Sequence, residues 1–370
     1  MTAPAVLLPT DAQQSRQRAT HRPLLHHITA VDAEADVNAI IVPAARSAGS
    51  LAHATRLAAE LGCPLLVLCS LEATPAGVRA QTAGSGVEVF AVESPETSRL
   101  PVLESRFMRL DSSLRRQTDT PGKRNFGLAL AWMAGWERVL FLDDDIDIRD
   151  ASEVRRAAAL LDDYEVVGLD NVGFPDNSVV CHAHRDTGGH QGTFIGSGAM
   201  LFRRSRATSF FTSIYNEDWF FLLDPHGLAR CAVYGTFSQA RFDPYAVKNR
   251  AVTEEFGDCL AEGLFSLLDD GRTLDEAAAT PFWEAFRADR EEFITGILRR
   301  LDTAPGISVF RRMQMAEALH AARAGLHQFT SDDCVSYLKT WQVDKQVWRT
   351  WVEALPVGLT IGEAWTHLTS

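Results

Sequence analysis

The chain has 370 residues, of which 46% are hydrophobic and 23% charged, a composition typical of a globular protein with a large buried core. Its formal net charge of −12 argues against nucleic acid or an anionic membrane surface as the main partner. No run approaches the roughly 18 apolar residues of a transmembrane helix, and the first residues lack the pattern of a signal peptide. The six cysteines are scattered without a Cys-x-x-Cys pair, so we expect free thiols and a cytoplasmic location.

Residues 1–36 show no helical or strand periodicity, so we predict a tail or an irregular lead-in there. This segment contains His21, His26 and His27, which raise the possibility of a metal site. No ligand partners are evident nearby, and exposed titrating side chains are therefore the favoured interpretation.

Strands and helices alternate after this segment. Short apolar, β-prone runs occupy residues 37–46, 64–69 and 87–92, and helical patterns occupy residues 51–61 and 75–83. This alternation predicts a parallel sheet with right-handed crossovers. Pro43 can end a strand but cannot continue a central ladder, so the loop that follows it falls at the carboxyl edge of the sheet, where ligands bind. Neither a Gly-x-Gly-x-x-Gly motif nor a P-loop is present.

The most informative stretch is the apolar run 139–142, which follows Arg138 and leads directly into Asp143, Asp144 and Asp145. It is short and β-prone, so it predicts a buried strand that ends at a charged edge. Three adjacent carboxylates repel one another unless a cation compensates them. Oxygen ligands of this kind suit Mg²⁺ or Mn²⁺. A solvated acidic turn is the alternative, although such turns rarely follow a fully apolar strand.

A helical segment, residues 123–131, precedes this strand and begins Lys-Arg-Asn-Phe-Gly. An Arg-Asn-x-Gly helix followed by a strand ending in Asp-x-Asp resembles the GT-A glycosyltransferases, and most closely their inverting family 2 group. The resemblance covers residues 37–225. It implies an α/β fold of the GT-A (Rossmann-like) type, with a mostly parallel sheet flanked by helices.

The resemblance also implies a donor site. Asp145, with Asp143, would hold the metal that bridges the donor diphosphate, and Arg124 would flank the nucleotide. The remaining donor-site residues that it nominates are Pro43, Ala44, Arg46 and Asp144. Four arginines of the polar segment 93–122 either steer the anionic donor or are plain surface charges; they are Arg106, Arg109, Arg115 and Arg116.

Two further segments match the family in order and spacing. The small residues Gly196, Ser197 and Gly198 would line the donor-sugar and acceptor pocket, although a β-bulge with close backbone packing explains them equally well. The sequence Glu217–Asp218–Trp219 matches the Glu-Asp-Trp/Tyr that carries the catalytic base. We therefore predict Asp218 as the base, with Glu217 supporting it or touching the acceptor. Simple capping of a helix N-terminus is the alternative.

The histidines beyond residue 180 leave a third metal ligand open. Residues 178–184 are predicted to form a strand, on which His182 and His184 would face the same side. A two-histidine metal site there is disfavoured because no carboxylate lies nearby. A third ligand for the donor-site metal could come from His184, His190 or His226. Residues 237–242 faintly resemble the Gln-x-x-Arg-Trp of processive family 2 enzymes, but the spacing is one residue short and Trp is missing, so a processive polymer synthase is not expected.

From residue 252 the pattern is helical, with further helices expected at 282–301, 311–326 and 331–355. Glu255, Asp258 and Glu262 share one helix face, which is expected to be solvated rather than to bind a cation or a basic acceptor. We thus divide the chain into a lead-in (1–36), a catalytic domain (37–250) and a helical C-terminal region (251–370). The last region could shape an acceptor site or a homo-oligomer interface.

The expected function is a metal-dependent transfer of a sugar from a nucleotide-sugar to an unknown acceptor hydroxyl or amine, with inversion. UDP is the expected nucleotide and GDP the alternative, and retention stays open because enzymes of both stereochemistries share Asp-x-Asp. A phosphatase of the Asp-x-Asp-x-Thr type is disfavoured because Asp147 occupies the fifth position. An EF-hand is disfavoured because Ile148 replaces the required glycine. A non-catalytic nucleotide-binding relative is disfavoured by the intact Glu217–Asp218 pair.

Overall fold

The computed structural model describes residues 16–94, 99–107, 114, 116, 118–247 and 249–370. Of the arginines in segment 93–122, Arg109 and Arg115 therefore lie outside the described residues, as does the first part of the predicted lead-in, residues 1–15.

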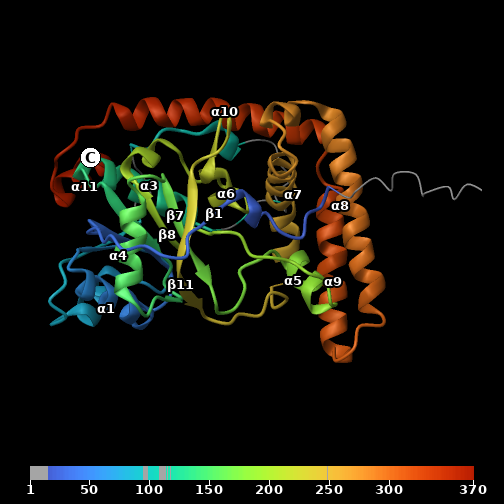
Figure 1. The fold of residues 1–370 in the computed structure, drawn as a ribbon, viewed down its shortest axis with the longest axis horizontal. Helices are drawn as coiled ribbons and strands as arrows, with labels where there is room; N and C mark the ends of the chain where they lie inside the picture. The colour runs from blue at the N-terminus through green and yellow to red at the C-terminus, as the bar shows by residue number, and fades with distance from the viewer. Residues whose placement is uncertain (1–15, 95–98, 108–113, 115, 117, 248) are drawn as a thin grey trace, which may run out of the picture.

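A mostly parallel sheet forms the centre of the molecule (Figure 1). The described chain builds it from nine strands, in the order β1-β11-β7-β8-β5-β2-β3-β4 with β6 paired to β11. Along this order only β8 runs antiparallel to its neighbours, β5 and β7. The strands are β1 (His26–His27), β2 (Ala39–Ala44), β3 (Leu65–Cys69), β4 (Val89–Glu93), β5 (Arg138–Leu142), β6 (Ile146–Asp147), β7 (Val166–Asn171), β8 (Ala199–Arg203) and β11 (Cys231–Gln239); β9 (Leu223–Asp224) and β10 (Gly227–Leu228) form a separate pair.

Helices cover both faces of this sheet. They are α1 (Ala52–Leu61), α2 (Pro75–Thr82), α3 (Thr120–Ala134), α4 (Ala151–Leu160), α5 (Val179–Asp186), α6 (Glu217–Leu222), α7 (Arg250–Asp269), α8 (Thr280–Leu301), α9 (Val309–Leu326), α10 (Ser331–Glu353) and α11 (Ile361–Thr369). Alternate residues of β2 enter different cores: Ile40 and Val42 pack with α1 and α4, whereas Ile41 packs with α3. The predicted fold class, an α/β sheet flanked by helices with an all-helical C-terminal region, is confirmed.

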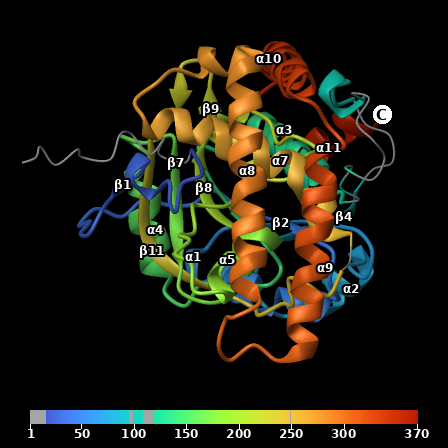
Figure 2. The same ribbon diagram turned by 90° about the vertical axis from the view of Figure 1, so that its right-hand side faces the viewer.

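The C-terminal helices extend the core on the α3 face of the sheet. In Figure 1, α10 runs across the top of the molecule, and α11 returns the chain to α3. Figure 2 shows α8 and α9 standing side by side in front of the sheet. The helix α11 was not predicted from the sequence, whereas the three expected C-terminal helices correspond to α8, α9 and α10.

The strand order places a topological switch point between β2 and β5. The chain moves outward from β2 to β3 and β4, then returns to β5 on the other side of β2. The β2–β5 ladder ends at the pair Ile41–Phe141, so Pro43 lies beyond it and keeps a partner only in β3. In open α/β sheets, ligands bind in the crevice outside the carboxyl ends of such strands. Here that crevice lies between the loop after Ala44 and the Asp143–Asp145 turn.

One predicted strand is wrong. Residues 179–184 belong to α5, which Ser178 caps at its N-terminus: the Ser178 hydroxyl accepts a hydrogen bond from the Cys181 N–H at 3.3 Å. Residues two apart on a helix face different ways. His182 therefore stacks on Phe174, with ring centroids 5.2 Å apart, whereas the Nδ1 of His184 lies 2.6 Å from the Arg300 guanidinium.

Within the described ranges, none of the helices has both the length and the apolar character that a membrane crossing requires. All six cysteines are buried and free.

Candidate active site

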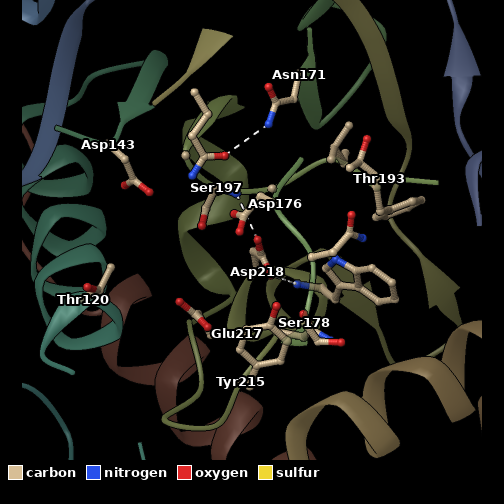
Figure 3. Close-up of a pocket in the computed structure, with 18 of the residues that line it drawn as sticks. Thr120, Asp143, Asn171, Asp176, Ser178, Thr193, Ser197, Tyr215, Glu217 and Asp218 are labelled. Atoms are coloured by element: carbon tan, nitrogen blue, oxygen red, sulfur yellow. Dashed lines mark hydrogen bonds between the residues drawn. The ribbon is translucent and has the colours of Figure 1, made fainter. Parts of the chain in front are cut away.

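A cavity of about 290 Å³ opens at the switch point, at the carboxyl edge of the sheet (Figure 3). Its walls come from the ends of β2, β5 and β7, from the loops before β8 and α6, and from α7. Of the residues predicted for the site, those that line it are Pro43, Arg46, Arg124, Asp143, Asp144, Asp145, Gly196, Ser197, Gly198, Glu217 and Asp218. Ala44 is instead fully buried, and its carbonyl accepts a hydrogen bond from the Lys123 ammonium at 2.8 Å.

Asp144 shapes the loop that follows β2. One of its carboxylate oxygens accepts the backbone N–H groups of Ala45 and Arg46, each at 2.8 Å, and the other pairs with the Arg46 guanidinium. The carboxylate is buried by these contacts. Asp144 therefore links the end of β2 to the end of β5, and both of its carboxylate oxygens are already engaged by the protein.

Asp145 ends the Asp143–Asp145 turn and lies close to other negative charges. Burial, together with the charge of Asp143, raises its pKa to about 6, although the Arg46 guanidinium lies 3.0 Å away and lowers it. A divalent cation at this point would relieve that repulsion. Within the described residues, no three His, Cys, Asp or Glu side chains converge on a ready-made metal cage. The residues thus fit an ion held by one or two carboxylates together with substrate phosphates, which is a common mode for Mg²⁺.

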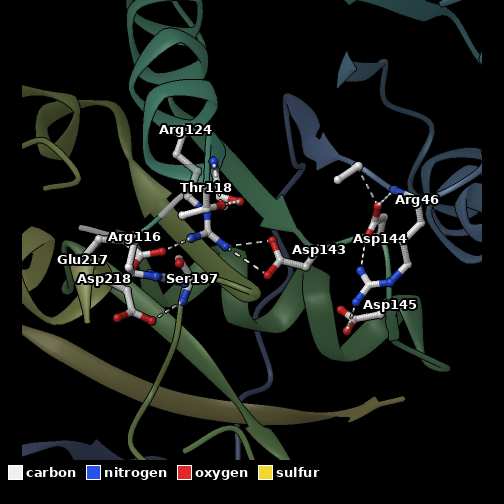
Figure 4. Close-up of polar contacts among 12 residues, drawn as sticks. Arg46, Arg116, Thr118, Arg124, Asp143, Asp144, Asp145, Ser197, Glu217 and Asp218 are labelled. Carbon is white, nitrogen blue, oxygen red and sulfur yellow. Dashed lines mark hydrogen bonds and ion pairs between the residues drawn. The ribbon is translucent and has the colours of Figure 1, made fainter. Parts of the chain in front are cut away.

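A line of ion pairs connects Asp143 to α6 (Figure 4). The Nη2 of Arg124 lies 2.7 Å and 3.0 Å from the two oxygens of Asp143, and its Nη1 lies 3.2 Å from Glu217. Arg116 holds the other Glu217 oxygen at 2.6 Å. Because Arg124 and Glu217 are both buried, these pairs are screened only weakly by salt. Glu217 therefore sets the position of Arg124 and Arg116.

Asp218 sits one residue further along, in the first turn of α6. Its Oδ2 accepts the Ser197 N–H at 3.2 Å and its Oδ1 accepts the Trp219 N–H at 2.9 Å. No Lys, Arg or His of the described chain forms an ion pair with it. Burial, with the neighbouring charge of Glu217, raises the pKa of Asp218 to about 6. A carboxylate poised near neutral pH at the wall of a cavity is suited to proton transfer.

The Gly196–Gly198 segment lies between the two acidic groups. A Cβ atom on Gly198 would come within 2.7 Å of the Ile146 side chain and 3.2 Å of the Asp143 carboxylate, and one on Gly196 within 3.1 Å of the Asp218 carboxylate. The carbonyl of Gly198 also accepts the Asp143 N–H at 2.8 Å. The backbone of this segment therefore packs closely and also lines the cavity.

Several lining residues were not predicted. Asn171 ends β7, Asp176 lies in the loop that follows, Gln239 ends β11, and Arg250 begins α7. The surrounding protein, with the charge of Asp218, raises the pKa of Asp176 to about 7, although this carboxylate remains accessible from the cavity. The sequence offers a positional signal: the apolar run 166–169 precedes these residues, and residues just beyond the carboxyl end of a parallel strand reach the ligand edge.

The histidine that lines the cavity is His21, and none of the three proposed as a third metal ligand does so. His21 is buried between the carboxylates of Asp269, at 2.5 Å, and Glu262, at 3.0 Å. Burial alone would lower its pKa, but the two carboxylates raise it to about 9. The expectation of an exposed histidine at this position is therefore wrong, although His26 and His27 are exposed.

The expectation of a solvated acidic face on α7 is also wrong. Glu255, Asp258 and Glu262 are each at most 2% exposed. They turn inward because α8 supplies a buried partner, Arg290, and the lead-in supplies His21.

No protein-family model matches the chain, and no curated protein matches it in sequence. Solved structures do resemble it. The mannosyltransferase PcManGT from Pyrobaculum calidifontis, in complex with GDP-Man and Mn²⁺, is 13% identical, with a TM-score of 0.43 over 87% of this chain and 91% of its own. Glucosyl-3-phosphoglycerate synthase from Mycobacterium tuberculosis, in complex with Mn²⁺, UDP and phosphoglyceric acid, is 15% identical, with a TM-score of 0.40 over 59% of this chain and 79% of its own. A197 from STIV is 11% identical, with a TM-score of 0.27 over 56% of this chain and 87% of its own. At these TM-scores, the likenesses assign no activity to this chain.

Proposed function

We propose that this protein is a GT-A-type glycosyltransferase that moves a sugar from a nucleotide-sugar to an acceptor hydroxyl or amine, with inversion. The observation that carries the proposal is the pairing of two features in one cavity. Asp143 and Asp145 lie at the switch point between β2 and β5. Asp218, which has no ion-pair partner among the described residues, lines the same cavity with its pKa raised to about 6.

The donor end of the cavity is built to receive charge of both signs. Asp145 and Asp143 would hold Mn²⁺ or Mg²⁺, which supplies positive charge opposite the leaving diphosphate. Arg46 and Arg124 already pair with these carboxylates, so the same guanidinium groups can turn to the phosphate oxygens when a donor binds. We expect UDP as the nucleotide, with GDP as the alternative.

Asp218 would act as the general base. The acceptor oxygen attacks the anomeric carbon, its proton passes to Asp218, and the bond to the diphosphate breaks with its electron pair on the leaving group. A single displacement of this kind inverts the anomeric carbon. The N–H groups of Ser197 and Trp219 donate hydrogen bonds that orient the Asp218 carboxylate before the acceptor binds. The Glu217–Arg124 pair links the base to the donor end.

A thermal-shift panel tests the donor site. UDP, GDP and their sugar conjugates are titrated with and without Mn²⁺ against the wild type, Asp145→Ala and Asp147→Ala. Asp147→Ala is a matched control because it removes the same charge two residues further along, in β6, where the carboxylate lies 2.7 Å from Arg56 and outside the cavity lining. A nucleotide at about 100 times its Kd should stabilise the protein by roughly 2.7 kcal/mol.

We expect a Mn²⁺-dependent shift with one nucleotide, lost in Asp145→Ala and kept in Asp147→Ala. Release of the nucleoside diphosphate from the matching sugar conjugate then shows transfer. The absence of a shift with every nucleotide overturns the donor-site assignment and favours a phosphatase. Binding without release identifies a non-catalytic relative. The cytoplasmic location and a homo-oligomer built through the C-terminal helices stay predictions.

A further inference from the structure

The cavity continues past Asp218, away from the predicted metal site. In Figure 3, Asp143 and Thr193 lie on opposite sides of the Asp176 and Asp218 carboxylates. The far end is lined by Thr193, Gln191 and the half-buried rings of Phe194 and Trp219. If the donor occupies the Asp143 side, as the proposed function requires, this far end is where the acceptor is held.

The polar groups at this end accept hydrogen bonds. Asp176 forms no ion pair with any described residue, and Asp218 binds only two backbone N–H groups. Gln191 is 6% exposed, and its Oε1 has no hydrogen-bond partner in the described structure. A buried carbonyl oxygen without a partner is uncommon in folded proteins, and it indicates that a ligand with a hydrogen-bond donor, such as a hydroxyl group, belongs at this end of the cavity.

The cations nearby are already engaged. Arg116 lies 2.6 Å from Glu217, and Arg250 lies 2.6 Å from Glu254. Arg250 offsets the charge of Asp176 in part but stays outside ion-pair distance. His21, whose ring lies 5.3 Å from that of Trp219, is held between Asp269 and Glu262. Among the described residues, the acceptor end therefore presents Asp176 and Asp218 while each nearby cation is paired with another carboxylate. A phosphate or carboxylate group placed there would be repelled by the negative charges of these carboxylates. It would also accept hydrogen bonds, whereas the side chains at this end need hydrogen-bond donors.

Aromatic rings complete the wall. Trp219 is held edge-on by Phe194, with ring centroids 5.1 Å apart, and it also packs against Phe265 at 4.7 Å. A fixed ring of this kind offers an apolar surface to the C–H face of a ligand, while the carboxylates take its polar edge. Hydroxyl groups on one edge and C–H groups on the faces are the features of a sugar or cyclic polyol.

We propose that the acceptor is an uncharged polyhydroxy compound, a sugar or polyol, which Asp176 holds by one hydroxyl while Asp218 takes the proton of its neighbour. The inference rests on the proposed function and specifies the substrate class of the same site. Asp176 is then a residue that determines acceptor specificity. It would discriminate against anionic acceptors through its charge and would orient neutral ones through its hydrogen bond.

The test uses four acceptors with one ring and different charges: glucose, glucosamine, glucose 6-phosphate and glucuronate. Initial rates of nucleoside diphosphate release are measured above the background with water, using the donor found in the thermal-shift panel. We expect glucose to raise the rate at least tenfold more than either anionic sugar. A preference for glucose 6-phosphate or glucuronate overturns the inference. So does a result in which none of the four sugars raises the rate. A marked preference for glucosamine overturns it in favour of an amine acceptor.

Asp176→Asn isolates the role of the charge, because it keeps the shape of the side chain and removes its negative charge. We expect the KM for glucose to rise at least tenfold. We also expect the ratio of the rate with glucose to the rate with glucose 6-phosphate to fall. Asp163→Asn, at an exposed carboxylate outside the cavity lining, is the matched control and should change neither value. An unchanged KM in Asp176→Asn refutes the assignment. Failure of the donor site is recognised separately, since it abolishes the nucleotide-dependent thermal shift.

Discussion

Arg290 on α8 carries the sharpest stability prediction, because it is fully buried with two carboxylates around it. Its Nε and Nη2 lie 2.8 Å and 3.0 Å from the two oxygens of Glu255, and Nη2 also lies 2.5 Å from Asp258. Replacing Arg290 by Met keeps most of the volume but leaves both carboxylates without their cation. Removing one partner of a buried ion pair costs about 3–5 kcal/mol, far more than the pair itself contributes.

The same change should reach the candidate active site. The second oxygen of Asp258 accepts the Asn216 side-chain N–H at 3.0 Å, and this hydrogen bond helps to fix Asn216 at a φ of +59°, a left-handed conformation that is uncommon outside glycine. Asn216 directly precedes Glu217 and Asp218. We therefore expect Arg290→Met to lower the turnover of the folded enzyme as well as its stability.

Urea denaturation at pH 7 measures the effect, with Arg299→Met as the matched control. Arg299 lies on the same helix but is exposed, and its ion pair with Glu292 should be worth at most about 1 kcal/mol. The triple variant Arg290→Met, Glu255→Gln, Asp258→Asn should recover most of the loss, because it removes the stranded charges. A loss below about 1 kcal/mol in Arg290→Met, or a triple variant no more stable than the single one, would refute this reasoning.

Three further predictions concern titration and the base. The raised pKa values of Asp145, Asp218 and Glu255, about 6, 6 and 7, mean that the folded state binds more protons than the unfolded state. The free energy of unfolding should therefore fall as the pH rises from about 4 to 7, and Mn²⁺ with nucleotide should flatten that fall, which urea melts across this range will show. The pKa of His21 is also raised, to about 9, so the stability that His21 contributes is complete below the unfolded pKa of 6.5 and is lost as the pH rises through 9. A His21→Ala variant whose free energy of unfolding keeps the wild-type pH dependence between pH 7 and 9 would contradict this. Asp218→Asn should reduce turnover by about 10²–10⁴-fold, and the wild-type rate should rise with pH through about 6 as Asp218 ionises; near-normal turnover in the variant at saturating donor would remove Asp218 from the role of base.

The parts of the site that could be predicted from the sequence are those whose signals are local. The apolar run before Asp143 identifies both the strand and its charged end, and the position of Asp218 at a helix start follows from the residues around it. Helix α7 and the division into strands and crossover helices follow from periodicity in the same way. These features need only a few neighbouring residues to specify them.

The features that were missed depend on partners distant in the sequence. The sequence around Glu262 does not indicate that His21, 241 positions away, forms an ion pair with it. The pattern of charges on α7 therefore predicts a solvated face. The run Val179–Val180–Cys181 favours a strand by composition, but the Ser178 cap and packing against α7 and α9 make it a helix. Asp176 lies in an irregular loop, where no periodicity marks which side chain turns toward the cavity.

The docking of the lead-in also has a consequence for how the protein is made. Four side chains of the lead-in contact partners that follow them by 241 to 273 positions, namely those of Arg16, Gln17, Arg18 and His21, and His21 lines the cavity. At a synthesis rate of about 5–20 residues per second, these partners leave the ribosome roughly 10–50 s after the lead-in does. The lead-in is thus made well before the helices that hold it, and a nascent chain cannot complete the pocket until α7 has emerged.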